Sequence, residues 1–206
     1  MKKILFLSCL FSFIILKSQN LDNSNTLIKN SPFHFFDGTF HLSYERAVST
    51  NKSLNISGGF HFRGDNYYNN MQEDIGWNCE IQLRRYLISF DSDVLLNGIY
   101  FSPYFKGGYF KYKELSYWYI NYDSNGDYYD VFYPESLFEI KNYQGGLIMG
   151  VQMLFKEIIV FDLFLGGGIQ YAELNRDNFY HSNNGIWGRN YSGVVPRIGL
   201  NIGVVF

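Results

Sequence analysis

The sequence predicts an all-β fold: a closed antiparallel transmembrane β-barrel of about eight strands in up-and-down order. Three observations predict it. Apolar and polar residues alternate with a period of two, short and long turn segments alternate along the chain, and the composition is aromatic without being hydrophobic. Aromatic residues make up 20% of the chain and glycine contributes 20 of 206 residues, yet the mean hydropathy is -0.15. A chain with one lipid-facing and one wet face has this composition.

The N-terminal segment has the layout of a secretory signal peptide. Lys2 and Lys3 precede an apolar stretch over residues 4–16, and this stretch is shorter than the ~20 residues that a membrane-spanning helix needs. We therefore expect residues 1–19 to be removed on export and residues 20–206 to form the barrel domain.

Charge and cysteine content restrict the function classes. The formal net charge of -2 provides no basic field for nucleic acid, so we expect no nucleic-acid partner. Cys9 would be lost with the signal peptide, which leaves Cys79 without an internal disulfide partner. A lipoprotein anchor at Cys9 is the alternative, but the apolar stretch continues past that residue.

The period-two pattern assigns side chains to two faces, because successive residues of a strand point in opposite directions. On one face the residues are apolar, and on the other they are mostly polar or glycine. The apolar positions are Phe40, Leu42 and Tyr44; Leu54, Ile56, Phe60 and Phe62; Ile75, Trp77, Cys79, Ile81 and Leu83; Tyr143, Leu147, Met149, Val151, Met153 and Phe155; Ile159, Phe161, Leu163, Leu165, Ile169 and Tyr171; and Ile198, Leu200, Ile202, Val204 and Phe206.

Turn signals divide these runs into eight strands, and no helix is predicted. Asp37-Gly38 fits a two-residue type I′ hairpin turn, which would separate strands over residues 27–36 and 39–47. Short turns at one end and long loops at the other are typical of outer-membrane barrels, with the short turns periplasmic. The short connections are predicted near 48–52, 88–98 and 156–158, and the long ones near 64–74, 113–139 and 173–193.

A secreted lipocalin-like barrel is the soluble alternative, with the apolar face inside. The polar face carries ionic residues and many glycines, which suits a narrow lumen better than a watery exterior. The chain also ends on Phe206, in phase with the apolar face. This terminal aromatic resembles the signal by which the barrel insertion machinery recognises its substrates. We therefore predict the cell outer membrane as the location, with membrane lipid and that machinery as partners.

Several segments resemble a known family. They are Gly38 to Arg46, Arg85-Tyr86-Leu87, Tyr100 to Tyr109 and Pro196 to Gly203. Together they are similar to the uncharacterised DUF3575-type outer-membrane β-barrel proteins of Bacteroidetes. The resemblance covers most of the chain after the signal peptide. It implies a location and a fold, and it implies no activity or catalytic residues.

The inward charges are the best-defined chemical feature. Charges in a narrow interior must be paired or hydrated, so we predict a structural salt-bridge cluster that plugs the lumen. A gated, narrow conduction path is the alternative, although an eight-strand barrel has room for little more than its side chains. The predicted lumen charges are Glu45, Glu80, Arg84, Lys106, Asp162 and Arg197.

One sequence pattern is compatible with an enzyme. The pattern His41-x-Ser43-x-Glu45 places an imidazole, a hydroxyl and a carboxylate on one strand face. Neighbouring positions on that face are about 6.6 to 6.8 Å apart along the strand, which is beyond hydrogen-bond reach of a nucleophile and its base. We expect no enzyme activity, no metal and no cofactor, and a lipid-modifying enzyme remains the less favoured alternative.

The predicted loops hold weaker signals. Arg63-Gly64-Asp65 matches an adhesion tripeptide, which arises often by chance. Asp123-x-Asn125-x-Asp127 suggests calcium ligands but lacks the later glycine and glutamate of an EF-hand loop, so a hairpin tip at Asn125-Gly126 fits better. The aromatic loops could bind an unknown surface ligand or form hairpin extensions and an aromatic girdle. The sequence therefore predicts a non-enzymatic, structural or surface-interaction protein, with a narrow pore as the alternative.

Overall fold

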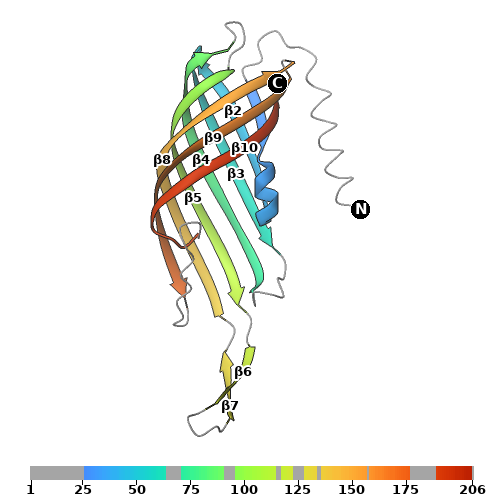
Figure 1. Cartoon of the computed structure of the whole chain (residues 1–206), viewed down its shortest axis with the longest axis vertical. Coiled ribbons are helices and arrows are strands. Elements are labelled where there is room, and N and C mark those ends of the chain that lie inside the picture. Colours follow the sequence, from blue (N-terminus) through green and yellow to red (C-terminus); the bar gives the residue numbers. More distant parts are fainter. Residues whose placement is uncertain are drawn as a thin grey trace, which may run out of the picture.

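A closed ring of strands dominates the molecule (Figure 1). The structure, a computed structural model, describes residues 26–63, 71–90, 96–114, 117–122, 128–133, 136–156, 158–176 and 189–205. Within these residues eight antiparallel strands pair in the order β1-β10-β9-β8-β5-β4-β3-β2, and β1 pairs with β2 to close the ring. The predicted fold, an eight-strand up-and-down barrel, is confirmed. The strands are β1 (Thr26–Asn30), β2 (Thr39–Ser49), β3 (Lys52–Arg63), β4 (Met71–Ser89), β5 (Gly98–Glu114), β8 (Ser136–Phe155), β9 (Ile159–Arg176) and β10 (Gly193–Val205).

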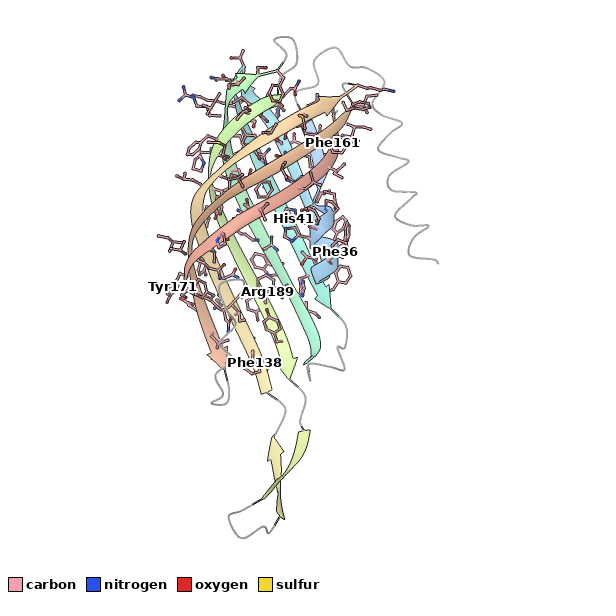
Figure 2. The ribbon with its side chains drawn as sticks, viewed as in Figure 1. Phe36, His41, Phe138, Phe161, Tyr171 and Arg189 are labelled. Atoms are coloured by element: carbon pink, nitrogen blue, oxygen red, sulfur yellow. The ribbon has the colours of Figure 1, made fainter. Side chains whose placement is uncertain are left out.

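The alternation of the sequence becomes the two surfaces of the wall (Figure 2). Every predicted apolar position that the structure describes is exposed or half-buried on the outside, and Leu165 and Ile169 are among the most exposed. The polar positions between them are mostly buried inside, and Glu45 and Asp162 have no exposed surface at all. The barrel is therefore apolar outside and polar inside, which is the opposite of a lipocalin-like barrel.

The connections follow the predicted asymmetry. Residues 50–51 join β2 to β3, and residues 156–158 join β8 to β9, at the end of the ring where the C-terminal strand also finishes (Figure 1). The strands that precede the longer connections, β3, β5 and β9, finish at the other end (Figure 1). Within the described residues, no helix has both the length and the apolar character needed to cross a membrane.

The segment before Gly38 differs from the prediction. A strand over residues 27–36 was expected, but the strand ends at Asn30 and a 3-10 helix, η1 (Pro32–Asp37), follows. Pro32 opens this helix, where its missing N–H costs nothing. Gly38 has a φ of 77° and ends the helix, donating its backbone N–H to the carbonyl of Phe35. The predicted type I′ hairpin turn at Asp37-Gly38 is therefore wrong.

The early end of β1 leaves an incomplete section of wall, which we call the seam. β1 pairs with β10 only over Ile202 to Val205, whereas β10 begins at Gly193. On the side facing β2, no described strand pairs with residues 193–201 of β10. η1 occupies this space between β2 and β10, and the Ser31 hydroxyl donates to the Leu200 carbonyl of the β10 edge at 3.3 Å.

Aromatic rings fill part of the lumen. Tyr100, Tyr104 and Phe110 point inward from β5, which explains why this strand shows the least regular alternation in the sequence. Inward glycines on neighbouring strands make room for the rings. A Cβ at Gly150 would collide with the Tyr100 ring, and the same holds for Gly76 with Phe110 and for Gly199 with Phe164. Each glycine faces its ring directly across the ladder.

A separate hairpin extends the connection between β5 and β8. Its strands are β6 (Tyr117–Tyr122) and β7 (Tyr128–Tyr133), which pair with each other in a two-stranded sheet. The predicted hairpin in this aromatic segment is confirmed. Its tip, residues 123–127, lies outside the described residues, and so does the predicted turn at Asn125-Gly126.

Candidate functional site

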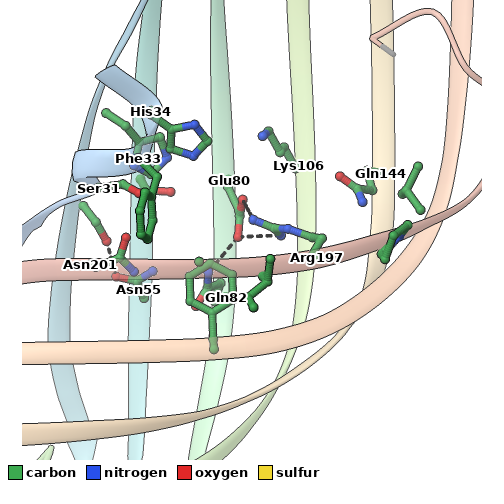
Figure 3. A pocket seen from close by; sticks show the side chains of 18 of the residues that line it. Ser31, Phe33, His34, Asn55, Glu80, Gln82, Lys106, Gln144, Arg197 and Asn201 are labelled. Carbon is green, nitrogen blue, oxygen red and sulfur yellow. Dashed lines mark hydrogen bonds and ion pairs between the residues drawn. The ribbon is translucent and has the colours of Figure 1, made fainter. Parts of the chain in front are cut away.

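A cavity of about 330 Å³ lies inside the barrel wall (Figure 3). A bidentate ion pair crosses it: Arg197 on β10 donates to both carboxylate oxygens of Glu80 on β4, at 3.0 and 2.9 Å. Gln82 donates to Glu80 Oε1 at 2.6 Å, and the Arg197 guanidinium lies 4.3 Å above the Tyr104 ring centre. Lys106, which also lines the cavity, stands opposite Glu80 on the neighbouring strand.

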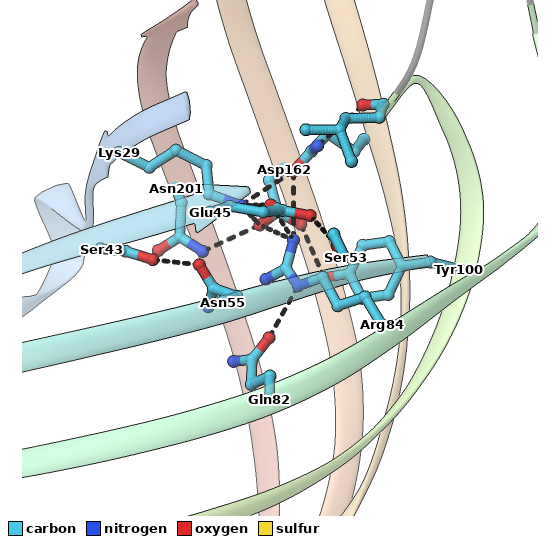
Figure 4. Close-up of polar contacts among 12 residues, drawn as sticks. Lys29, Ser43, Glu45, Ser53, Asn55, Gln82, Arg84, Tyr100, Asp162 and Asn201 are labelled. Carbon is cyan, nitrogen blue, oxygen red and sulfur yellow. Dashed lines mark hydrogen bonds and ion pairs between the residues drawn. The ribbon is translucent and has the colours of Figure 1, made fainter. Parts of the chain in front are cut away.

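A second group of charges, the ion cluster, lies inside the barrel and is linked by many polar contacts (Figure 4). It consists of Lys29, Glu45, Arg84 and Asp162, whose side chains are fully buried. Lys29 Nζ lies 2.5 Å from Glu45 and 3.0 Å from Asp162. Arg84 Nη1 lies 3.0 Å from Glu45 and 2.9 Å from Asp162. Each cation thus contacts both anions, and the cluster carries no net charge.

Neutral side chains complete the ion cluster. Glu45 Oε1 accepts hydrogen bonds from the hydroxyls of Ser53 at 2.5 Å and Tyr86 at 2.9 Å. Asp162 accepts from Tyr100 at 2.7 Å and from Asn201 at 3.1 Å. These donors help to offset the hydration that the two carboxylates lose on burial, whereas Arg84 Nη2 is buried without a hydrogen-bond partner among the described residues.

Gln152 links the two cations of the cluster. Its Oε1 accepts from Lys29 Nζ at 2.9 Å and from Arg84 Nη1 at 3.1 Å. Its amide nitrogen donates to the Tyr86 hydroxyl and to the Leu96 carbonyl, both at 2.8 Å. The network therefore joins residues from β1, β2, β4, β8 and β9 across the whole lumen, which is the arrangement of a side-chain plug.

A third group lies toward the long-loop end of the lumen. Arg189, in the connection between β9 and β10, donates to the Tyr112 hydroxyl at 3.1 Å and lies within 3.2 Å of both ring nitrogens of His61. Its guanidinium stacks 4.4 Å from the Phe110 ring centre. The Arg189 carbonyl also accepts from Asn142 at 3.2 Å. This part of the loop is thus folded back against the inner wall.

All the charged residues predicted for the lumen are found there. The structure divides them between two groups, with Glu45, Arg84 and Asp162 in the ion cluster and Glu80, Lys106 and Arg197 at the cavity. Gln82 connects the two groups, because its amide oxygen accepts from Arg84 Nε at 2.8 Å and its amide nitrogen donates to Glu80 Oε1 at 2.6 Å.

The sequence analysis missed two lumen cations, Lys29 and Arg189. Lys29 lies in a five-residue strand and shares its inward face with the apolar Leu27. The period-two pattern therefore marked no polar face in that strand. Arg189 reaches the lumen from a connecting loop, where alternation carries no information.

The candidate catalytic pattern does not assemble as a nucleophile with its base. Ser43 donates its hydroxyl to Asn55 at 2.5 Å, and Glu45 is engaged in the ion cluster. The His41 ring, 8% exposed, contacts the His34 ring with 4.9 Å between their centres. Its Nδ1 is buried and has no hydrogen-bond partner among the described residues.

Other predicted features fall outside the described residues. These are the signal peptide over residues 1–19, the terminal Phe206, Gly64 and Asp65 of the adhesion-like tripeptide, and the Asp123 to Asp127 segment. Cys79 lies within the described residues and is a free, exposed cysteine on the outer face.

Comparison with solved structures identifies a barrel of similar fold. No family model matches the sequence, and no curated protein matches it. Among solved structures, the chain is similar to the N-terminal β-barrel domain of Pseudomonas aeruginosa OprF, with 14% sequence identity and a TM-score of 0.35. The match covers 89% of this chain and 98% of that chain.

Proposed function

We propose that this protein is a small outer-membrane β-barrel with a side-chain-plugged lumen and a structural or surface-interaction role. One observation carries the proposal: the apolar side chains cover the outside of a closed ring, whereas the charged side chains inside it are buried and mutually paired. A monomer in water would expose a large apolar surface, which soluble proteins rarely do. Hydrocarbon is the solvent that matches this surface, and outside the seam the closed ring pairs the backbone groups that face it.

The proposed orientation places the short turns in the periplasm and the long loops outside the cell. Outer-membrane lipid and the barrel insertion machinery would be the partners, and the role would need no cofactor, no enzyme activity and no nucleic acid. Membership of the DUF3575-type family of Bacteroidetes stays a prediction. The loops, with the β6–β7 hairpin, are the surface on which we expect an external partner to bind.

The location is tested by separating inner and outer membranes of cells that express the full chain. We expect the protein in the outer-membrane fraction, and we expect its mobility on SDS gels to change on boiling, because a closed barrel resists the detergent until it is heated. Recovery as a soluble periplasmic protein would contradict the proposal.

A narrow pore is the second candidate, and the cavity beside the Glu80–Arg197 pair favours it. Recordings in planar lipid bilayers separate a pore from a plug. The plugged barrel should give no stable conductance steps above lipid leakage. A matched double variant, Arg84→Ala with Asp162→Ala, removes one cation and one anion from the ion cluster. Its heat-dependent gel mobility shows whether it folds, and the folded variant should give conductance steps. Stable steps from the unaltered protein would favour the pore.

A further inference from the structure

We propose that the cavity binds the headgroup of a single-chain anionic amphiphile, such as a fatty-acid carboxylate, which enters sideways from the membrane through the seam. This inference rests on the proposed membrane location. It adds to that proposal a ligand class and a route, and neither is needed for a plugged structural barrel.

The first step is that the cavity borders the seam. Most of its lining faces the lumen, but Phe33 of η1 and Pro196 and Ile198 of β10 also line it. All three belong to the outer face or to the segment that fills the seam, and Ile198 is 76% exposed. These residues place the cavity directly beside the seam, where β10 has no described strand on the side facing β2.

The second step is that the seam is a weak section of the wall. Elsewhere in the barrel, ladders of backbone hydrogen bonds join neighbouring strands. At the seam, the hydrogen bond from the hydroxyl of Ser31, the residue before η1, to the Leu200 carbonyl joins this segment to the β10 edge. Pro196 lies in the stretch of β10 that has a described strand on one side only, which is where a residue without an N–H donor is tolerated. Displacing η1 would therefore break few backbone hydrogen bonds.

The third step concerns the chemistry on the two sides of the opening. On the outside, Phe36 is 86% exposed, and Val194 and Ile198 are also strongly exposed. On the inside, the cavity lining contains the cations Lys106 and Arg197 and the single carboxylate of Glu80, and these three groups sum to one formal positive charge. An apolar entrance that leads to a cationic interior matches an amphiphile with an acidic head.

His41 adds an independent observation. Its ring is more than nine-tenths buried, it lines the cavity, and its Nδ1 has no hydrogen-bond partner in the described structure. Buried polar atoms normally have a partner. An oxygen of a bound headgroup would provide one if that nitrogen carries the proton.

The width of the seam selects a single chain. One strand is missing between β2 and β10, so the opening spans about two interstrand distances, or roughly 9 to 10 Å. η1 contacts both β2 and β10 within that width, so an acyl chain enters only when η1 shifts. One chain requires a smaller shift of η1 than two chains side by side would.

Photo-crosslinking tests the inference. The full protein is inserted into phosphatidylcholine nanodiscs that contain a trace of a diazirine-labelled palmitate, irradiated, and mapped by mass spectrometry. We expect adducts concentrated on residues 33–36 and 194–198, above the background at Leu163 on the outer face of β9. Lys106→Gln should lower seam labelling about tenfold, because it removes a hydrogen bond to a charged group. Lys141→Gln, which removes an exposed lysine outside the cavity, should leave it unchanged.

Competitors and a folding control make each outcome decisive. Unlabelled palmitate should displace the probe. Displacement by inorganic phosphate, or equally well by the two-chain lipid phosphatidylglycerol, would overturn the single-chain assignment, and uniform labelling around the barrel would overturn the seam site. If those results came from protein that shows the heat-dependent gel shift, this inference alone would fail. Protein that does not insert into nanodiscs would contradict the proposed membrane location instead.

Discussion

Four buried charges in one network make the ion cluster sensitive to the loss of any single member. Lys29 and Arg84 each contact both Glu45 and Asp162, so removing one cation leaves two buried carboxylates facing the other cation. Breaking a buried pair in this way costs about 3 to 5 kcal/mol, far more than the loss of a surface ion pair.

We therefore expect Lys29→Met and Glu45→Gln each to lower the free energy of unfolding by about 3 to 5 kcal/mol. The double variant keeps the cluster neutral and leaves the Arg84–Asp162 pair intact, so its loss should be smaller than the sum of the two single losses. Urea unfolding in lipid vesicles, followed by tryptophan fluorescence, measures all three. Simple additivity would show that the two charges do not interact.

The glycines beneath the inward rings give a second test on single residues. Gly150→Ala places a methyl group against the Tyr100 ring, which also holds Asp162, and overpacking of this kind costs about 1 to 3 kcal/mol. Gly145→Ala, on the outer face of the same strand, meets nothing closer than the Tyr104 carbonyl at 3.9 Å. Unfolding experiments should show a loss for the first variant and little change for the second. Equal losses would contradict the packing argument.

Among the elements, β8 offers a test of which face meets lipid. Leu147 lies near the middle of this strand and Phe155 ends it, and both point outward. Leu147→Arg should cost about 2 to 4 kcal/mol in a bilayer, and Phe155→Arg about 1 kcal/mol or less, because the cost of a lipid-facing charge falls toward the interface. Refolding into vesicles of defined thickness measures both. The same small cost at both positions would argue against a membrane belt around β8.

The β6–β7 hairpin is an element that the barrel does not need. It pairs only with itself among the described strands, while the β5–β8 ladder continues to Glu114 and Ser136 beneath it. Replacing residues 116–134 with a two-residue Asn-Gly turn should change the free energy of unfolding by less than about 0.5 kcal/mol. If a surface partner exists, in-cell crosslinking from this segment should detect it and the shortened chain should lose it. A failure of the shortened chain to fold would show that the hairpin supports the barrel.

At the scale of the whole molecule, the asymmetry of the two ends predicts an orientation in the cell. With Cys79 replaced by Ala, single cysteines at Asn51 and Ser192 mark the short-turn end and the long-loop end. A membrane-impermeant maleimide applied to intact cells should label the Ser192→Cys protein and not the Asn51→Cys protein, and broken cells should allow both. Labelling of Asn51→Cys alone in intact cells would mean the reverse orientation.

The limits of prediction from the sequence are clearest at η1 and at Lys29. Alternation identified the faces of the long strands, because tilted strands in a two-faced wall must alternate. It could not identify η1, whose residues include three phenylalanines that suit a strand equally well, although Pro32 and Gly38 are signals for the start and end of a short helix. Lys29 escaped because five residues are too few for a period of two to be recognised.

The sequence by itself determined that this chain forms a barrel of eight strands, with apolar residues outside and charged residues inside. Local backbone geometry is sufficient for that, since each residue's face depends only on its position along its own strand. Only the tertiary structure decided which charges meet. Lys29 and Asp162 are separated by 133 positions and reach 3.0 Å because the ring closes between the first strand and the last. The seam also depends on the tertiary structure. It exists because β1 is too short to pair with the whole of β10, and η1 lies where the rest of that strand would be.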